Sequence, residues 1–595
     1  MAYLIGVEFP VNSVGELPLS YLDAKPKEKA EALLANAREI LEMYGVKERI
    51  KKTNQLRYVP YKPLSLEDRT PKERIQAIRT LIDGGSFEEA IEETATLIKT
   101  ALEGLRYLQT YDWLFLRALI TIGYLGWTAF ALTTVVDLHI LQGTTQPQRS
   151  TGGTIVFSSI LAALLTSFIA SRSPLTYYAY AFFPVFFWEE VYARRESLVR
   201  GRKALFGHIG SGNDLLSLVL GAVVYVGIVE SLAVGYIHRE VLTVLFWIGA
   251  LYPLAHGLSF LQKHPVLTTT WFVSCAVMGI FTLLPANKVE NITLIRLQLR
   301  TLFDLSQTGL VMLSIIITRS SALSLQAKGG LPRTKQVAGW LVLIASLLVP
   351  LAHQLQPNSH YIHRLMVIFL GFAPTFVILT ISYEALFYVV YATLLLSWIQ
   401  LESRIQEFTG APADPPTKEA QKTRSPPSAA SNGLRFRPLR LSDARVALFF
   451  FVLFQSAFFS TGNIASISTF SLESVCRLLP VFDPFAQGAM LIFKIMIPFV
   501  FVSASLGILN KLLSVAPSAL FMFAVGMSDI LTLHFFWVVR DEGSWLEIGS
   551  TICHFVVASL VCVFVVLMEG VSAMFISGVE VGKELSEKPL AQDSL

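Results

Sequence analysis

From Trp113 onward, the sequence consists of apolar runs separated by short polar joints. A helix needs about 20 apolar residues to cross a bilayer, and hydropathy marks about 14 runs that approach this length. They are centred near residues 128, 162, 182, 225, 250, 275, 311, 344, 372, 391, 453, 497, 526 and 560. Hydrophobic residues make up 53% of the chain and charged residues 15%, which excludes an ordinary soluble protein. The sequence therefore predicts an all-α polytopic membrane protein with about 13 to 14 transmembrane helices.

The charge balance limits the partners of the chain. A net charge of +4 is too small for a nucleic-acid-binding protein, and the basic residues gather between apolar runs. The four cysteines form no CxxC pair and no disulfide framework, so they do not indicate a redox compartment.

Residues 1–110 precede the apolar runs and are expected to be a short soluble segment. Apolar residues recur at helical spacing between Lys27 and Lys51, which predicts an amphipathic helix. Its apolar positions are Leu33, Ala37, Ile40, Leu41 and Tyr44. Thr70-Pro71-Lys72-Glu73 is a capping box for a helix that ends at Gly84-Gly85, and Ser86 to Glu89 repeats the pattern. We expect these last two helices to form an α-hairpin that leads into the membrane.

The composition predicts a division into five parts. They are the soluble segment 1–110, a first part of the transmembrane bundle at 111–400, a disordered connector at 401–444, a second part of the bundle at 445–578 and a polar tail at 579–595. The connector is rich in Pro, Ser and Ala, as disordered segments often are. The apolar stretch 364–400 is interrupted at Ser382-Tyr383-Glu384, which fits either two spans with a tight turn or one span with a re-entrant piece.

Basic joints indicate the orientation of the chain. The joints 194–203 and 319–335 are rich in Arg and Lys, which predicts that both are cytosolic and that residues 1–110 are lumenal. The joint after the sixth run is then lumenal as well. It carries the sequon Asn291-Ile292-Thr293, which makes Asn291 the predicted glycosylation site.

The connector 401–444 gives conflicting signals. Its seven basic residues predict a cytosolic position, whereas a count of spans that includes both halves of 364–400 places it in the lumen. We follow the charges, which puts the segment after Phe459 on the lumenal side.

The stretch from Phe459 to Pro498 departs most from a simple series of spans. An apolar run breaks at Thr461-Gly462-Asn463 into small and hydroxyl-bearing residues, and a short helix capped by Ser471 and stopped by Pro480 is expected to follow. A second apolar run begins after Asp483-Pro484. Non-helical backbone at membrane depth needs protein or water to satisfy its polar groups, so we interpret this stretch as the floor of a site.

Several long motifs resemble one known family. They are GNIASIS at 462–468, TFSLESV at 469–475, VFDPF at 481–485, SYEALFY at 382–388, YLIGVEFPVNSVGELPLSYL at 3–22 and NAREILEMYGVKE at 36–48. The membrane motifs resemble the C-terminal membrane region of the GPI ethanolamine phosphate transferase 1 family, and the first segments resemble the last part of its lumenal domain. The resemblance runs from the first residues almost to the end of the chain.

The resemblance implies an enzyme of GPI-anchor biosynthesis in the endoplasmic reticulum membrane. In that family, an α/β domain similar to alkaline phosphatase uses a threonine nucleophile and two zinc ions to transfer ethanolamine phosphate. The donor is phosphatidylethanolamine, and the acceptor is the first mannose of a mannosylated GPI precursor lipid. Residues 1–110 would then hold the tail of that domain, and we expect its metal-binding part to lie upstream of Met1.

No residue of this chain is assigned to catalysis or to a metal. The ten histidines are scattered and form no HxH, DHG or HExxH spacing, and GxSxG and Walker motifs are absent from the sequence. No cofactor is therefore expected in this chain, and the two zinc ions are implied only for the catalytic domain of the family.

Ionisable residues inside apolar runs are the remaining functional candidates, because each costs about 2.5 to 3.5 kcal/mol at a helix centre. They are Glu230, Lys494, Asp529 and Glu569. One interpretation is that they pair across helices and orient the bundle. The other is that Lys494 contacts a lipid phosphate while Asn463, Ser466 and Ser468 bind the glycan or head group, which makes these four residues the predicted substrate-binding site.

The sequence is also compatible with two other functions. A lipid or solute transporter also has many apolar runs with buried charges, although the two halves of the chain show no convincing repeat. A non-catalytic scaffold that assembles other membrane subunits is the third interpretation.

Overall fold

The computed structural model describes residues 2–7, 13–55, 58–65, 70–207, 212–284, 307–326, 331–352, 360–381, 383–408, 436–462 and 474–579. Within these ranges the regular elements are all helical, and no β-strand is present. The α-helices are α1 (Ala2–Ile5), α2 (Pro26–Asn54), α3 (Lys62–Ser65), α4 (Pro71–Asp83), α5 (Phe87–Gln109), α6 (Trp113–Val135), α7 (Thr151–Ala170), α8 (Leu175–Ala193), α9 (Arg195–Phe206), α10 (Gly212–Gly235), α11 (Val241–Ala250), α12 (Leu258–Lys263), α13 (Pro265–Leu283), α15 (Gln307–Gln326), α16 (Arg333–Ala352), α17 (Tyr361–Ile378), α18 (Glu384–Phe408), α19 (Asp443–Phe459), α20 (Pro484–Leu512), α21 (Pro517–Val538) and α22 (Trp545–Phe575). Four short turns complete the set, the 3-10 turns η1 (Leu19–Tyr21), η4 (Tyr252–His256) and η7 (Val475–Arg477) and the π-helical turn η3 (Val136–Ile140).

The predicted all-α polytopic architecture is confirmed. By length and composition, the described residues contain nine helices able to cross a membrane, and two shorter apolar helices accompany them. Each of the predicted run centres falls inside a helix. The centres outside the nine candidate spans lie in α8, α11, α15, α16 and α19.

The chain forms two compact units. Unit 1 comprises Met1–Phe130 and Pro147–Glu196, and unit 2 comprises Ala131–Gln146 and Ser197–Leu595. The five-part division expected from composition remains a prediction. Most of the predicted connector, residues 409–435, and the tail from 580 lie outside the described residues.

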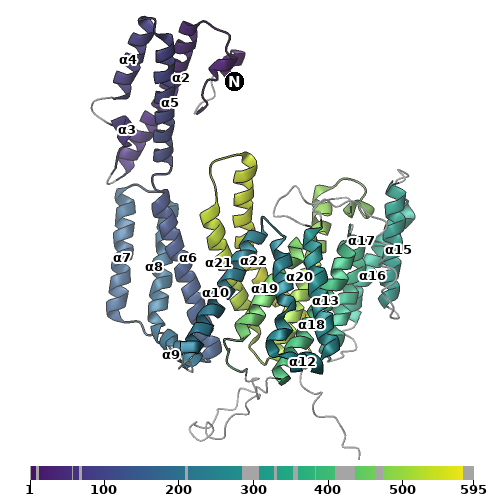
Figure 1. The fold of residues 1–595 in the computed structure, drawn as a ribbon. Helices are drawn as coiled ribbons and strands as arrows, with labels where there is room; N and C mark the ends of the chain where they lie inside the picture. Colours follow the sequence, from purple (N-terminus) through teal and green to yellow (C-terminus); the bar gives the residue numbers. More distant parts are fainter. Residues whose placement is uncertain are drawn as a thin grey trace, which may run out of the picture. The chain divides into compact units, whose positions relative to one another are not determined.

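The N-terminal part of unit 1 is built on a pair of long helices, α2 and α5, which pack along each other (Figure 1). The apolar positions predicted on the first helix are all buried in this contact, together with Leu97, Ile98 and Leu105 of α5. Helix α4 packs more lightly on α5. The hairpin expected from α4 and α5 is therefore part of a three-helix arrangement with α2, because the apolar stripe of α5 is wide enough to contact both α2 and α4.

The two predicted helix caps differ in outcome. Thr70 caps α4 as expected, since its Oγ1 accepts from Glu73 N while Glu73 Oε2 accepts from Thr70 N at 2.9 Å. Ser86 makes no side-chain cap, so the prediction that it repeats the capping box is wrong. Glu88 and Glu89 in the first turn of α5 favour that helix start through the helix dipole instead.

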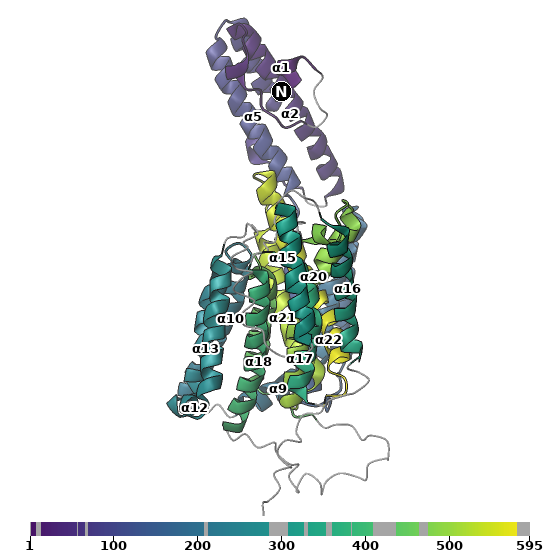
Figure 2. The same ribbon diagram turned by 90° about the vertical axis from the view of Figure 1, so that its right-hand side faces the viewer.

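Unit 2 holds the large membrane bundle, in which α17 and α18 form a helical hairpin around a buried turn. Rings of Phe369 and Phe376 on α17 stack on Tyr388 of α18, with centroids 4.9 and 4.7 Å apart. Both helices are candidate spans by length and composition, which favours the interpretation of 364–400 as two spans with a tight turn. Figures 1 and 2 show α17, α18 and α20 side by side.

Contacts between helix ends distinguish two ends of unit 2, which we call the junction end and the basic end. At the junction end, α17 stops at Ile378 and α18 begins at Glu384, and Phe281 near the end of α13 stacks on Tyr383. At the basic end, α18 stops and α19 begins, and Arg445 of α19 forms an ion pair with Glu402 of α18 at 2.6 Å.

Several cations at the basic end bind the carbonyl groups at helix termini. Arg437 Nε donates to Leu513 O at the end of α20, and Lys511 Nζ donates to Ile576 O at the end of α22. Arg364 at the start of α17 donates to Phe575 O, so α17 starts at this same end. Cations at helix C-termini are favourable because the last carbonyls have no partner within the helix.

One orientation prediction is wrong. The joints 194–203 and 319–335 were both expected in the cytosol, yet α16 begins at the junction end, where Gln336 Nε2 donates to Leu478 O at 2.8 Å. Helix α9 adjoins η3, which binds Leu439 at the basic end. The basic count misleads because Lys335 donates to Ser320 O and Ser324 Oγ at the end of α15.

Candidate functional site

Most residues of the predicted substrate site lie outside the described part of the structure. This holds for Asn463, Ser466 and Ser468, for the expected cap Ser471 and for the predicted glycosylation site Asn291. Their roles remain predictions. The described residues on both sides of the stretch 463–473 show where it is attached.

The first attachment is the end of α19. The helix stops at Phe459, and Gly462 adopts a φ of 77°, a left-handed conformation that suits glycine. The predicted break at Thr461-Gly462 is therefore confirmed on its described side. Before Pro480, the described part of the predicted short helix is the three-residue turn η7.

The second attachment is the start of α20, which begins as predicted after Asp483-Pro484. The Asp483 carboxylate accepts from the backbone N of Phe485 at 3.0 Å and of Ala486 at 3.3 Å. Proline at the first position suits a helix start because its missing N–H has no partner there. This cap fixes the register of α20 and so the direction of Lys494.

Lys494 lies in the bundle interior and pairs with Glu384. Its Nζ lies 2.6 Å from Glu384 Oε2, and the two side chains are 6% and 1% exposed. Glu384 Oε2 also accepts from the backbone N of Ile381 at 2.9 Å. The same carboxylate therefore caps α18 and neutralises the Lys494 ammonium of α20. Lys494 and Glu384 thus tie the α17–α18 turn to the first half of α20.

Glu384 was missed as a site residue although it stands in the SYEALFY motif. A signal existed, because an acidic residue at the start of a helix within a long apolar stretch is rare and needs a partner. The sequence did not show which cation would meet it, since Lys494 lies more than a hundred residues away.

Arg477 of η7 holds the other side of the same turn. The guanidinium donates from Nη1 to Thr380 O at 2.7 Å and to Ile378 O at 3.3 Å. Its side chain is buried, and this burial lowers the pKa of the guanidinium to about 10. Val475 and Leu478 pack against Ile378 and Leu379, which keeps η7 seated on the turn.

Several buried polar atoms at this end have no hydrogen-bond partner among the described residues. Ser474 Oγ and Gln487 Oε1 are two of them. The amide nitrogen of Gln487 is used, since it donates to Leu479 O at 3.0 Å. A buried acceptor left open is costly, so a water molecule or a ligand hydroxyl is the expected partner.

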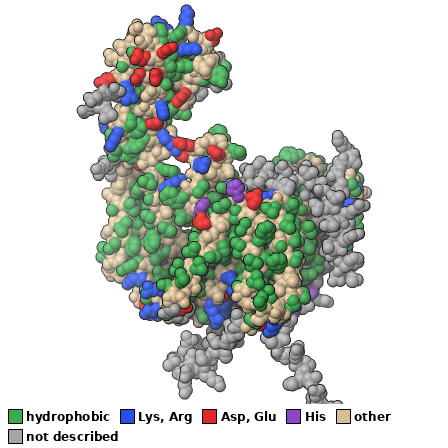
Figure 3. Space-filling model, in the orientation of Figure 1, with side chains coloured by type: hydrophobic (Ala, Val, Ile, Leu, Met, Phe, Trp, Pro, Cys, Tyr) green, Lys and Arg blue, Asp and Glu red, His purple; other side chains and the backbone are tan. Residues whose placement is uncertain are grey.

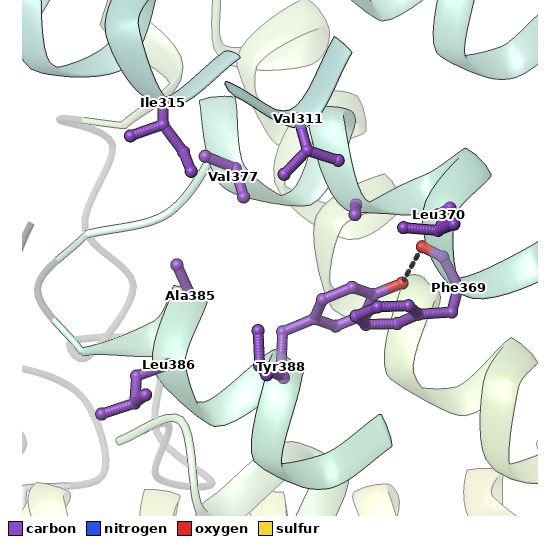
Figure 4. A pocket seen from close by; sticks show the side chains of 10 residues that line it. Val311, Ile315, Phe369, Leu370, Val377, Ala385, Leu386 and Tyr388 are labelled. Carbon is purple, nitrogen blue, oxygen red and sulfur yellow. Dashed lines mark hydrogen bonds between the residues drawn. The ribbon is translucent and has the colours of Figure 1, made fainter. Parts of the chain in front are cut away.

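An apolar crevice lies between α15, α17 and α18 (Figure 4). One of its lining residues, Ala385, directly follows Glu384 in the sequence. Tyr388 contributes its ring only, because its hydroxyl donates to Phe369 O at 3.0 Å. The lining is formed by Val311, Ile315, Phe369, Leu370, Ala373, Val377, Ala385, Leu386, Tyr388 and Val389.

The other intramembrane ionisable residues are placed on different helices. Glu230 of α10 lies 2.8 Å from His534 Nδ1 of α21, and Asp529 of α21 interacts with the Cys562 thiol of α22. Glu569 is half-buried on α22. The contacts of Glu230, Asp529 and Lys494 therefore join helices, as the first interpretation expected.

The described residues do not fit a zinc site. Among them, no group of three His, Cys, Asp or Glu side chains is arranged to hold a metal ion.

Comparison with known proteins identifies the family. Residues 103–544 match the family model described as Phosphatidylinositolglycan class N (PIG-N). No solved structure matches the chain.

Similar proteins carry one name. A GPI ethanolamine phosphate transferase 1 of Neurospora crassa is 61% identical over 98% of this chain and 62% of its own length. The protein of that name from Chaetomium globosum is 60% identical over 98% of this chain and 68% of its length, and that from Yarrowia lipolytica is 40% identical over 99% and 63%. This chain thus spans about three fifths to two thirds of these relatives. The matches over almost its whole length show that it belongs to the phosphatidylinositolglycan class N family.

Proposed function

We propose that this chain is the membrane domain of a transferase that acts in GPI-anchor biosynthesis in the endoplasmic reticulum. Ethanolamine phosphate would move from phosphatidylethanolamine to the first mannose of a mannosylated GPI precursor. The chain would present both lipids to a catalytic domain, which supplies the two zinc ions. The family match and the names of its relatives support this proposal over a transporter or a scaffold.

The observation that carries the proposal is the arrangement at the junction end. A buried ion pair, the open acceptor Gln487 Oε1 and the described residues that flank the hydroxyl-rich stretch 463–473, Gly462 and Ser474, occur together where α18 and α20 begin. The apolar crevice of α15, α17 and α18 includes Ala385, the residue that follows Glu384 at the start of α18. Polar groups next to an apolar crevice suit a molecule with a polar head and a hydrocarbon chain.

Positioning is a large part of phosphoryl-transfer catalysis, because the transferred group needs orientation and charge stabilisation more than covalent help. In this proposal, Lys494 contacts the lipid phosphate while Asn463, Ser466 and Ser468 bind the glycan or head group. Glu384 then sets the position of the Lys494 ammonium when no lipid is bound.

A chimera tests the proposal. The present chain replaces the matching part of the Neurospora crassa relative, and the product is expressed in cells that lack that relative. We expect transfer of ethanolamine phosphate to the mannosylated precursor to be restored. A chimera that inserts in the membrane at normal level but transfers nothing contradicts the proposal.

Two further outcomes follow for the isolated chain and for the site. The purified chain alone should show no transfer of ethanolamine phosphate. Metal-dependent turnover by this chain would contradict the assignment of catalysis to a separate domain.

In the chimera, Asn463→Leu with Ser466→Ala should lower turnover at unchanged melting temperature. A lower melting temperature with unchanged specific activity would instead assign these residues to the helix break.

A further inference from the structure

Helix α9 is an amphipathic surface helix at the basic end of unit 2. Its inner side is fixed, because Ser197 Oγ donates to Thr145 Oγ1 at 2.8 Å and Gly201 faces Val136 so closely that a Cβ would collide with it. Thr145 in turn donates to the Asp137 carboxylate. The opposite side of α9 exposes Arg200, Arg202 and Lys203.

A second basic segment adjoins the same support. Leu439 N donates to His139 O in η3 at 2.9 Å, and Gln142 Nε2 donates to Phe436 O at 3.2 Å. These bonds place residues 436–440 against the turn that also supports α9, with the side chain of Arg440 exposed. We call Arg202, Lys203 and Arg440 the α9 patch. In the part of Figure 3 that shows unit 2, Lys and Arg side chains gather at the lower end.

Nearby cations outside the α9 patch are held by protein groups. Arg437 is held by the Asp443 carboxylate at 2.8 Å, and Lys511 donates to helix-end carbonyls. Among the described residues, Arg202 and Lys203 have no ion-pair partner, and the sequence from Ser197 to Phe206 contains no acidic residue. The charge of this surface is therefore available to an external anion.

Exposed apolar side chains surround the patch. Val199 on α9 is 48% exposed, and Phe436 and Leu441 beside Arg440 are 40% and 45% exposed. Basic residues interleaved with exposed apolar ones are typical of a segment that lies in the interface plane of a bilayer. Helix α10, a candidate span, starts at Gly212, so the chain from α9 cannot move far from the membrane surface.

We propose that the α9 patch binds the head groups of anionic glycerophospholipids in the leaflet at the basic end of the bundle. The cations attract the lipid phosphates, and the apolar side chains reach the edge of the hydrocarbon layer. This site is separate from the proposed transferase site, which lies at the junction end, so the two proposals fail independently. Basic residues also orient a chain during insertion, but that role ends once the protein is in place.

The experiment compares nanodiscs of pure phosphatidylcholine with nanodiscs that contain one fifth phosphatidylinositol or phosphatidylserine. The purified chain should melt about 2 to 4 °C higher in either anionic nanodisc, and added salt should reduce this shift. The triple variant Arg202→Gln, Lys203→Gln, Arg440→Gln should keep its melting temperature in phosphatidylcholine and lose the shift. The matched control Lys72→Gln, Arg79→Gln, Lys99→Gln removes three exposed cations from α4 and α5 and should keep it.

Native mass spectrometry of the same samples gives a second readout, with retained anionic lipid expected on the parent and control but not on the triple variant. Replacing Arg202 and Arg440 by Lys should preserve both effects, because the recognition depends on charge. No shift in the parent, or equal shifts in the parent and the triple variant, would overturn the proposal. A shift of the same size produced by inorganic phosphate in phosphatidylcholine nanodiscs would also overturn it, since the ligand would then not be a lipid.

Discussion

At the residue scale, buried charges at the junction end are each held by a defined partner. Lys494 and Glu384 neutralise each other at 2.6 Å, and the carboxylate gains a backbone N–H from Ile381. Two charges removed from water recover their desolvation cost only with good geometry and further hydrogen bonds. This pair meets both conditions, so removing one partner leaves the other charge buried and uncompensated.

The first prediction separates structure from substrate contact at Lys494. Lys494→Met should destabilise the protein by about 3 to 5 kcal/mol, because it leaves the Glu384 carboxylate unpaired. Lys494→Met with Glu384→Gln should recover most of that loss, since Gln keeps an acceptor for Ile381 N. Thermal unfolding measures the cycle, and equal losses in the single and double variants would show that the pair is not the source.

In the chimera, the same double variant tests the contact with lipid. If Lys494 contacts the lipid phosphate, the double variant should have lower turnover although its stability is close to that of the parent. Normal turnover in the double variant would limit Lys494 to holding α18 and α20 together.

The second prediction concerns pH and the tyrosines of unit 1. Tyr44 and Tyr58 both donate to Glu48 Oε1, at 3.3 and 3.1 Å. Burial first and the Glu48 carboxylate second raise the pKa of both tyrosines above the usual value of about 10. Folding then favours the protonated phenols, so their contribution is complete below about pH 10 and is lost as the pH rises above it.

Alkaline unfolding of unit 1 tests whether its stability falls as the pH rises. The α2–α5 pair should lose helical signal above about pH 10, and Tyr58→Phe should weaken the dependence because Phe cannot ionise. Tyr21→Phe is the matched control, since Tyr21 is 81% exposed. A steeper alkaline loss in Tyr58→Phe than in the parent would contradict the assignment.

At the element scale, sequence patterns predict helices well and their neighbours poorly. Each hydropathy centre falls inside a helix, although nine described helices, not 13 to 14, are long and apolar enough to span a membrane. The capping box at Thr70 and the Asp483-Pro484 start were confirmed because these signals act within one or two turns. The partner of α5, the cation that meets Glu384 and the seat of η7 on the α17–α18 turn depend on residues far apart in the chain. Periodicity carries no information on such contacts.

The third prediction uses the crossing of α20 and α22. A Cβ at Gly507 would lie 2.3 Å from Ser572 Oγ and 2.7 Å from Ile576 Cδ1, and Ser572 Oγ donates to Ser503 O at 2.9 Å. Gly507→Ala should therefore push the helices apart and cost about 1 to 3 kcal/mol. Gly570→Ala on α22 has open space around the new methyl and should be neutral or stabilising by about 0.5 to 1 kcal/mol. Thermal melts compare the two, and equal effects would contradict close packing at Gly507.

At the scale of the whole molecule, the direction of each helix in unit 2 bears on membrane orientation. The end of α13, which precedes the sequon at Asn291, lies at the junction end with η7 and the start of α20. The helix ends that border the connector 401–444 lie at the basic end. The helix end before the sequon and the helix ends that border the connector therefore lie at opposite ends of the bundle. This agrees with the prediction from the basic residues, a lumenal sequon and a cytosolic connector, and disagrees with the span count that places both in the lumen. The cytosolic position of the connector itself remains a prediction.

The last prediction tests that position with two single cysteines. Ser431→Cys lies in the connector, whereas Val481→Cys lies at the junction end, where Val481 is 78% exposed. In sealed microsomes, which present their cytosolic side, an impermeant maleimide should label Ser431→Cys at once and Val481→Cys only after permeabilisation. The parent chain gives the background from its four native cysteines, of which Cys275 is buried. The expected difference arises because the bundle places the bordering helix ends on opposite sides of the bilayer. Labelling of both variants in sealed microsomes would contradict the separation of the two ends, and the reverse pattern would place the connector in the lumen and the candidate site in the cytosol.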